Sequence, residues 1–187
     1  MPTHRDQLLP LLAERSYFEG DFVLTSGQRS TYYIDLKKTS YDAEGRRLMG
    51  EAIADWIEAE GLEPDCVGGL TLGADAIAHA IGTAMARRGR PLRESTVRKA
   101  AKEHGRGRRI EGNFQEGDRV LVLDDVVTTG GSTIQAIEAY EEAGAEVLAA
   151  IAVVDREQGA AEAIAARGMR FAALFKLHEV QAARVGT

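Results

Sequence analysis

The sequence has only one cysteine, Cys66, among its 187 residues. A single thiol cannot form an intrachain disulfide, so the disulfide scaffold typical of small secreted proteins is excluded. The N-terminal segment MPTHRDQLLPLLAERS is interrupted by charge and is too short to be a signal peptide or to span a membrane. We therefore expect a cytoplasmic protein without a membrane partner.

Two common phosphate-binding signatures are also missing. No Gly-Lys dipeptide occurs, which excludes the Walker A loop of nucleotide hydrolases, and no Gly-x-Gly-x-x-Gly follows a predicted strand, which excludes the dinucleotide fingerprint. The composition, with 44% hydrophobic and 28% charged residues, is ordinary for a folded protein. We expect residues 1–187 to form a single domain.

The net charge of −6 at pH 7 argues against general nucleic-acid binding, but the charge is distributed unevenly. Residues 87–109 contain ten Lys or Arg against two Glu. Such a segment can be a solvated face of the protein or a mobile arm that binds a polyanion. Its place in the middle of the chain, between two well-patterned halves, favours the mobile arm.

Apolar strands alternate with helices along most of the chain. Short runs that are apolar throughout predict strands at 66–70, 119–125, 146–156 and 169–177. Apolar residues at helical spacing predict helices at 44–60, 74–89, 133–144 and 159–168. This alternation predicts an α/β fold with a doubly wound, mostly parallel sheet that is covered on both faces. Residues 17–38 break the rhythm and predict a small antiparallel or irregular attachment.

Polar, glycine-containing segments follow three of the predicted strands. They read GGLTLGAD (68–75), DDVVTTGGST (124–133) and VVDREQG (153–159). Ligands of doubly wound sheets bind beyond the carboxyl ends of the strands. We therefore expect the three segments to converge on one crevice.

The stretch VLVLDDVVTTGGST (120–133) carries the most specific chemistry. Its second half lies between a strand end and a helix start, where backbone N–H groups lack partners and the helix dipole favours an anion. Four hydroxyl side chains surround the two glycines: Thr128, Thr129, Ser132 and Thr133. Simple capping by Ser or Thr would explain one of them but not four, so the turn predicts a phosphate site.

Asp124 and Asp125 precede this turn directly. They could be the metal-binding acids of a nucleotide hydrolase, but that function requires the Walker A loop that the chain lacks. Carboxylates beside a phosphate pocket can instead accept hydrogen bonds from vicinal sugar hydroxyls. A ribose 5-phosphate would therefore satisfy the acids and the turn together.

The same stretch resembles the phosphoribosyl pyrophosphate signature of type I phosphoribosyltransferases, in which two acids and a Thr- and Gly-rich turn follow an apolar strand. Three further segments resemble orotate phosphoribosyltransferases. SGQRSTYYIDL (26–36) resembles the hood, VRKAAKEHGRGRRIEG (97–112) the flexible catalytic loop, and VVDREQG the aspartate–arginine turn. The motifs occur in the family's order from about residue 18 to residue 159.

The resemblance implies the type I phosphoribosyltransferase fold, with a hood at about 17–40 and a flexible catalytic loop at about 98–112. It implies transfer of the phosphoribosyl group from phosphoribosyl pyrophosphate to orotate, in de novo pyrimidine (UMP) biosynthesis. It also implies a homodimer with shared active sites, in which each loop reaches into the neighbour's site. Mg²⁺ would be bound mainly through the substrate, and no residue is assigned as a metal ligand.

The family's motifs also imply roles for individual residues. Phosphoribosyl pyrophosphate would bind to Asp124, Asp125, Val126, Val127, Thr128, Thr129, Gly130, Gly131 and Ser132. Orotate would bind to Thr128 and Arg156. The catalytic residues would be Arg98, Lys99, Lys102, His104, Asp124 and Asp125. Two of these assignments have plainer alternatives, because Arg156 could be a surface charge at a strand end and His104 an exposed loop residue.

Two positions depart from the family's pattern. Many orotate enzymes have lysine where this chain has Thr25 and Leu72, and both lysines are associated with the pyrophosphate end of the donor. Their absence makes the basic residues of the catalytic loop more important here. These loop cations are Arg98, Lys99, Lys102 and His104. The backbone N–H groups of residues 71–74 could hold the pyrophosphate instead.

Two other functions stay open at this point. The chain could be a type I phosphoribosyltransferase that acts on a purine or another base. It could also be a regulator that senses phosphoribosyl pyrophosphate and binds nucleic acid through the basic segment 87–109. The spacing Arg98-Lys99-x-x-Lys102-x-His104 favours the orotate enzyme over both, so we expect no nucleic-acid partner.

Overall fold

A six-stranded sheet forms the centre of the protein, which a computed structural model describes at residues 1–23, 27, 29–99 and 109–185. The strand order is β5-β4-β3-β6-β7-β8, and among these strands only the β4–β5 pair is antiparallel. The strands are β3 (Cys66–Leu70), β4 (Arg93–Val97), β5 (Ile110–Gly112), β6 (Arg119–Val127), β7 (Glu146–Asp155) and β8 (Phe171–Lys176). The prediction of a mostly parallel α/β sheet is confirmed.

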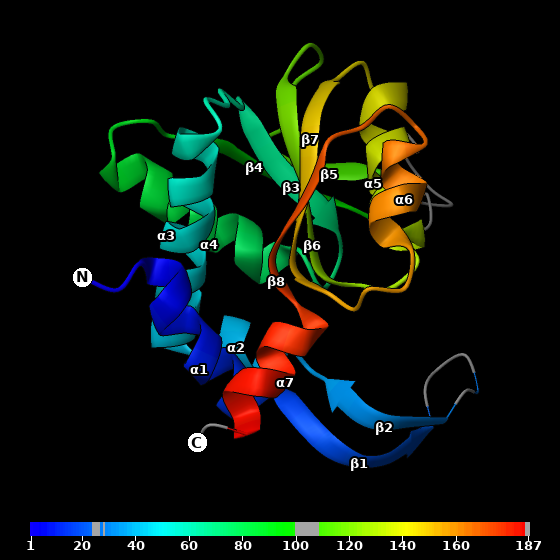
Figure 1. The fold of residues 1–187 in the computed structure, drawn as a ribbon. Helices are drawn as coiled ribbons and strands as arrows, with labels where there is room; N and C mark the ends of the chain where they lie inside the picture. Colours follow the sequence, from blue (N-terminus) through cyan, green and yellow to red (C-terminus); the bar gives the residue numbers. More distant parts are fainter. Residues whose placement is uncertain (24–26, 28, 100–108, 186–187) are drawn as a thin grey trace.

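Helices cover both faces of this sheet (Figure 1). α3 (Ala43–Ala59) and α4 (Asp75–Arg87) lie on one face, and α5 (Gly131–Glu142) and α6 (Ala160–Ala165) lie on the other. All the helices and strands predicted from the alternating pattern are present, so the doubly wound arrangement is confirmed. Within the part of the chain that the structure describes, no helix is long and apolar enough to cross a membrane.

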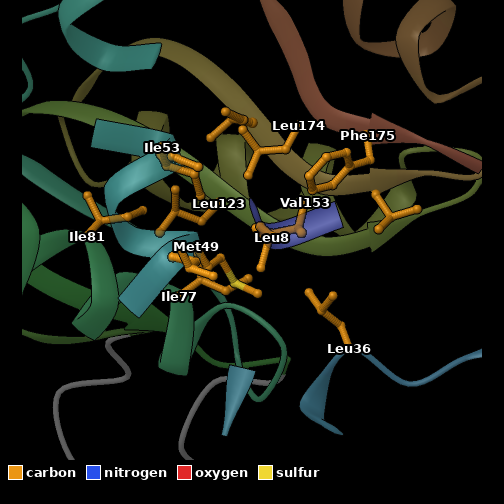
Figure 2. Packing of buried hydrophobic residues seen from close by; sticks show 14 of the residues in the cluster. Leu8, Leu36, Met49, Ile53, Ile77, Ile81, Leu123, Val153, Leu174 and Phe175 are labelled. Atoms are coloured by element: carbon orange, nitrogen blue, oxygen red, sulfur yellow. The ribbon is translucent and has the colours of Figure 1, made fainter. Parts of the chain in front are cut away.

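The apolar core lies in two layers, one on each face of the sheet. In the first layer Ile53 of α3 and Ile77 of α4 pack towards Leu123 and Val153 of the central strands, as Figure 2 shows. These four side chains are at most 1% exposed. Burial of each such side chain contributes about 1.5–3 kcal/mol. Ile137 of α5 belongs to the second layer, so both faces of the strands are buried, as their continuous apolar sequence requires.

Two terminal helices were not predicted. α1 (His4–Ser16) begins with a capping box in which the Thr3 hydroxyl accepts a hydrogen bond from the Asp6 N–H. Pro10 lies inside this helix and makes the segment look broken in sequence. α7 (Leu177–Val185) buries only Val180 and therefore has a weak apolar pattern. The two helices pack against each other, and α1 also packs against α3.

The segment that broke the rhythm forms a small antiparallel ribbon. Its strands are β1 (Tyr17–Val23) and β2 (Arg29–Ile34), and the short helix α2 (Lys37–Ser40) follows. The ribbon extends from the end of the molecule where β8 leads into α7 (Figure 1). Here Tyr17 stacks on Tyr32 with ring centroids 5.9 Å apart. The ribbon and α2 span the segment 17–40 that the resemblance assigns to the hood.

The described part of the basic segment 87–109 belongs to the folded body, so the prediction of a mobile arm is wrong for it. Residues Arg93–Val97 form β4 within the sheet. Arg88 donates hydrogen bonds to three carboxylates of α3, those of Glu51, Asp55 and Glu58, at 2.6, 2.7 and 2.8 Å. These ion pairs neutralise part of the excess positive charge and join α3 to the end of α4.

The loop implied at 98–112 is narrower in the structure. The Arg98 N–H donates to the carbonyl oxygen of Arg109 at 2.8 Å, so the backbone closes the base of the loop. Residues 110–112 form β5 and are not part of a loop. Residues 100–108, which include the predicted catalytic residues Lys102 and His104, lie outside the described residues.

Candidate active site

The three polar segments that follow β3, β6 and β7 meet at one edge of the sheet. These strands are parallel neighbours, so their carboxyl ends point the same way. Gly73 lies so close to Asp125 that a Cβ atom at this glycine would be 2.7 Å from the carboxylate carbon. The Arg156 N–H donates to the carbonyl oxygen of Val127 at 2.9 Å. The predicted convergence is confirmed.

The turn between β6 and α5 is built to accept an anion. Gly130 is the N-cap of α5 and has a left-handed backbone with φ 82°, which residues with a Cβ rarely adopt. No side chain caps the helix, so capping by Ser or Thr does not explain this sequence. The first N–H groups of α5 therefore remain available to a ligand, and the helix dipole favours a negative one.

Three of the four predicted hydroxyls are free to join these N–H groups. In the described part of the chain, no hydrogen bond occupies the side chains of Thr128, Thr129 or Ser132. Thr133 differs, because its Oγ1 donates to Asp124 Oδ2 at 2.7 Å and the residue is 1% exposed. The prediction of a phosphate donor is therefore wrong for Thr133, which instead holds Asp124 in place.

The two acids of β6 have different environments, because successive side chains of a strand point to opposite faces. Asp124 is 9% exposed, and its Oδ1 accepts a hydrogen bond from the Asp125 N–H at 2.9 Å. With Thr133 on Oδ2, both oxygens of Asp124 have protein donors. Asp125 is half-buried, and its Oδ1 accepts from the Val126 N–H at 2.8 Å. Asp125 is therefore the more accessible acceptor for sugar hydroxyls.

Burial raises the pKa of the Asp124 carboxyl to about 7. The hydrogen bond from Thr133 opposes this shift, and the neighbouring charge of Asp125 adds to it. Water solvates an exposed carboxylate well, whereas a buried one loses that solvation and holds its proton to higher pH. Asp124 thus carries a proton in the folded protein over a pH range in which it would be ionised in the unfolded chain.

This difference predicts a pH-dependent stability. The free energy of unfolding should fall as pH rises from about 4 to about 7, because the folded protein keeps a proton that the unfolded chain has lost. Asp124→Asn removes this titration, so its stability should fall less steeply, by up to about 1.4 kcal/mol per pH unit. Urea unfolding of both proteins at pH 5, 6 and 7, at one protein concentration, measures the effect. Equal slopes for the two proteins would contradict the assignment.

The loop cations begin beside the segment that follows β3. Arg98 follows Val97, whose carbonyl oxygen accepts a hydrogen bond from the Thr71 N–H at 2.9 Å. The Arg98 guanidinium is paired with Glu111 Oε1 at 2.9 Å, and Lys99 is exposed. Nη1 of Arg98 is thus engaged by Glu111 at the base of the loop.

The segment 71–74 offers fewer backbone donors than the sequence suggested. The N–H groups of Thr71 and Ala74 are already paired, with the carbonyl oxygens of Val97 and Leu70 at 2.9 and 3.3 Å. Within the segment 71–74, which the structure describes in full, the N–H groups of Leu72 and Gly73 remain available to a pyrophosphate. The Thr71–Leu72 peptide is cis, and the Leu72 side chain is 59% exposed. Thr25, the other departure from the family, lies outside the described residues.

Arg156 is held in the site and is not a free surface charge. Its Nε and Nη2 donate to the Tyr32 hydroxyl at 3.1 and 3.0 Å, and its side chain is half-buried. Its backbone is bonded to Val127, the residue before Thr128. The two residues that the resemblance assigns to orotate are thus brought to adjacent positions.

Comparison with known proteins agrees with this geometry. Residues 67–169 match the family model described as "Phosphoribosyl transferase domain", and with the anion turn and the two acids this match defines a phosphoribosyltransferase. The orotate phosphoribosyltransferase of Aquifex aeolicus is 45% identical over 179 residues, which cover 94% of this chain and 97% of that protein. The chain therefore belongs to the orotate phosphoribosyltransferase family.

Solved structures support the same assignment. A crystal structure of Mycobacterium tuberculosis orotate phosphoribosyltransferase with Fe(III) dicitrate is similar with a TM-score of 0.84 and 40% identity, covering 95% of this chain and 98% of that one. The structure of the M. tuberculosis enzyme in complex with phosphoribosyl pyrophosphate has a TM-score of 0.80 and 36% identity, covering 95% and 99%.

Proposed function

We propose that the chain catalyses its family's reaction at the carboxyl ends of β3, β6 and β7. The reaction transfers the 5-phosphoribosyl group from phosphoribosyl pyrophosphate to orotate. It gives orotidine 5′-monophosphate and pyrophosphate, in de novo pyrimidine (UMP) biosynthesis. The observation that carries the proposal is the arrangement at the end of β6. Asp124 and Asp125 lie in the last part of this strand, and the turn that follows, with Gly130 as the N-cap of α5, can bind an anion.

The donor would lie along residues 124–132. Its 5′-phosphate would accept hydrogen bonds from the free N–H groups of α5 and from Thr128, Thr129 and Ser132. Its ribose hydroxyls would donate to the Asp125 carboxylate, while Asp124 accepts the backbone N–H of Asp125 from the buried side. Its pyrophosphate would extend towards the segment 71–74 and the loop cations.

Orotate would bind between Thr128 and Arg156. Its carboxylate requires a cationic partner, and the planar fork of an arginine can meet a carboxylate with two hydrogen bonds. No carboxylate of the described residues forms an ion pair with Arg156, so its charge is available to an anionic ligand.

The chemical difficulty lies in the sugar. As the bond from C1 to the pyrophosphate oxygen breaks, positive charge develops on the ribose before the bond to orotate N1 is complete. Negative charge on Asp125 would stabilise that cation, so electrostatic stabilisation dominates the expected catalysis. Arg98, Lys99, Lys102 and His104 would close over the pyrophosphate and exclude water, which would otherwise hydrolyse the activated sugar.

Mg²⁺ would be held mainly by the substrate. The described residues contain no group of three or more His, Cys, Asp or Glu that could hold a metal by themselves. Asp125 is the accessible carboxylate at the end of β6. When bound with the donor, Mg²⁺ supplies positive charge that offsets the charge of the pyrophosphate.

We further propose that residues 1–187 act as one domain in the cytoplasm, with the hood at 17–40 and a catalytic loop within 98–112 that ends before β5. The single cysteine is buried and unpaired, which is compatible with a reducing compartment. A nucleic-acid partner is not expected. The net charge of −6 and the pairing of Arg88 with three acids argue against a basic binding face.

A homodimer with shared sites predicts complementation between defective subunits. Lys102→Ala removes a loop cation, and Asp125→Asn removes an acid from the site that the neighbour's loop enters. A mixed dimer would keep one site in which both groups are intact, so mixing the two impaired proteins should raise the activity, up to about a quarter of the wild-type level after random exchange. Subunit exchange is confirmed first with differently tagged chains. Exchange without recovered activity would contradict a shared site.

The reaction itself is tested by the ultraviolet absorbance of orotate, followed with phosphoribosyl pyrophosphate and Mg²⁺ in the presence and absence of protein. We expect consumption of orotate that depends on all three components. Uracil and adenine in place of orotate are the matched controls. Turnover of adenine but not of orotate would identify the chain as a purine enzyme, and turnover of neither base would overturn the proposed activity.

A further inference from the structure

Among the described residues Arg156 has one close side-chain partner, Tyr32 of the hood. Nε and Nη2 of Arg156 both donate to the hydroxyl oxygen of Tyr32, at 3.1 and 3.0 Å. The guanidinium carbon also lies 4.8 Å from the centroid of the Tyr32 ring. An arginine side chain loses up to about 2 kcal/mol of conformational entropy when it is fixed. The hydroxyl and the ring together fix the head of Arg156 before any ligand arrives.

The acids on either side of Arg156 are engaged elsewhere. Asp155 Oδ1 accepts a hydrogen bond from the Glu157 N–H at 2.8 Å. The Glu157 carboxylate is paired with His178 Nδ1 at 2.9 Å. A neutral hydroxyl therefore holds the Arg156 guanidinium where a carboxylate would have neutralised it. Its positive charge is kept for a ligand.

The hydrogen-bond count of Arg156 fits this arrangement. Guanidinium has five N–H donors, and Tyr32 takes one from Nε and one from Nη2. Both hydrogens of Nη1 and one of Nη2 remain, and these form the end-on fork that can bind both oxygens of a carboxylate. Tyr32 therefore orients the arginine without occupying this fork.

Tyr32 is itself fixed by the folded body. Its ring stacks on Tyr17, which is 4% exposed. The Tyr17 hydroxyl accepts a hydrogen bond from Gln181 Nε2 of α7 at 3.3 Å. A connected series of contacts thus runs from α7 through two stacked tyrosines to Arg156. These contacts connect the β1–β2 ribbon of the hood to the turn after β7.

We propose that Tyr32 is a positioning residue for orotate specificity, which holds the Arg156 guanidinium with its end-on fork directed at the carboxylate of the base. This inference rests on the proposed function, in which Arg156 binds that carboxylate. The hood then contributes to the choice of the base through Arg156.

The test is Tyr32→Phe, which keeps the ring and its stacking but removes the hydroxyl. We expect KM for orotate to rise by about 3- to 10-fold, the effect of losing hydrogen bonds of ordinary strength. The kcat value and KM for phosphoribosyl pyrophosphate should change by less than about twofold, because neither depends on the orotate carboxylate. Tyr41→Phe is the matched control. It removes the hydroxyl of a tyrosine that is 57% exposed and does not contact Arg156, and it should leave KM for orotate near the wild-type value.

A double-mutant cycle distinguishes a Tyr32 that positions Arg156 from a Tyr32 that contacts orotate directly or only stabilises the fold. If Tyr32 acts through Arg156, then Tyr32→Phe should have no further effect on orotate use in an Arg156→Ala background. An equal loss in both backgrounds would overturn the inference, as would a wild-type KM for orotate in Tyr32→Phe. Failure of the proposed function has a different outcome, because the wild-type protein would then not consume orotate at all.

Discussion

Asp125→Asn is expected to lower kcat/KM for phosphoribosyl pyrophosphate by about 10- to 150-fold, the effect of losing about 1.5–3 kcal/mol of hydrogen bonding to a charged group. Asparagine keeps the shape of the side chain but removes the anionic acceptor for the ribose hydroxyls. It also removes negative charge close to the carbon on which positive charge develops. Initial rates with varied donor, at saturating orotate and Mg²⁺, measure the loss.

Two variants make this result specific. Glu157→Gln changes a carboxylate at the same edge of the sheet that is paired with His178, and it should use the donor nearly as well as the wild type. Asp124→Asn should lose activity in the same direction but to a smaller extent, because both oxygens of Asp124 already have protein donors. Wild-type donor use by Asp125→Asn would exclude its contact with the sugar.

The sequence predicted those strands and helices well whose burial is reflected in their own pattern of apolar residues. Residues 120–123 of β6 are apolar on both faces of the strand because α4 and α5 cover both of its sides, so they read as one continuous apolar run. β4 was not predicted because four of the five residues of RESTV are polar and the strand lies within a basic segment. Its place between β3 and β5 depends on pairing partners that are distant in sequence. Local pattern carries no information about such pairing.

The site divides in the same way. The turn at Gly130 and the acids before it are contiguous in sequence, so their chemistry could be inferred from spacing alone. The different environments of the two acids could not, because they depend on which face of β6 is covered. The contact between Tyr32 and Arg156 joins residues that are 124 positions apart. Only the folded arrangement of hood and sheet brings them together.

Arg156→Lys and Arg156→Ala are both expected to lower kcat/KM for orotate by about 10- to 150-fold. Orotate differs from uracil by one carboxylate, so selection of orotate requires a group that binds this charge. Lysine keeps the charge but has no planar fork, and it cannot donate from two nitrogens to the Tyr32 hydroxyl as Arg156 does. The loss in Arg156→Lys should therefore be almost as large as the loss in Arg156→Ala.

The dependence on each substrate decides whether Arg156 serves the base or the donor. In both Arg156 variants kcat/KM for phosphoribosyl pyrophosphate should change much less than kcat/KM for orotate, because residues 124–132 and the loop bind the donor. Arg167→Lys is the matched control. Arg167 lies just after α6 and pairs with Glu138 of α5 at 2.9 Å, so this change should not affect kcat/KM for either substrate. If kcat/KM for phosphoribosyl pyrophosphate fell strongly while kcat/KM for orotate stayed at the wild-type value, Arg156 would be a donor-binding residue. Recognition of orotate would then have to come from another cation.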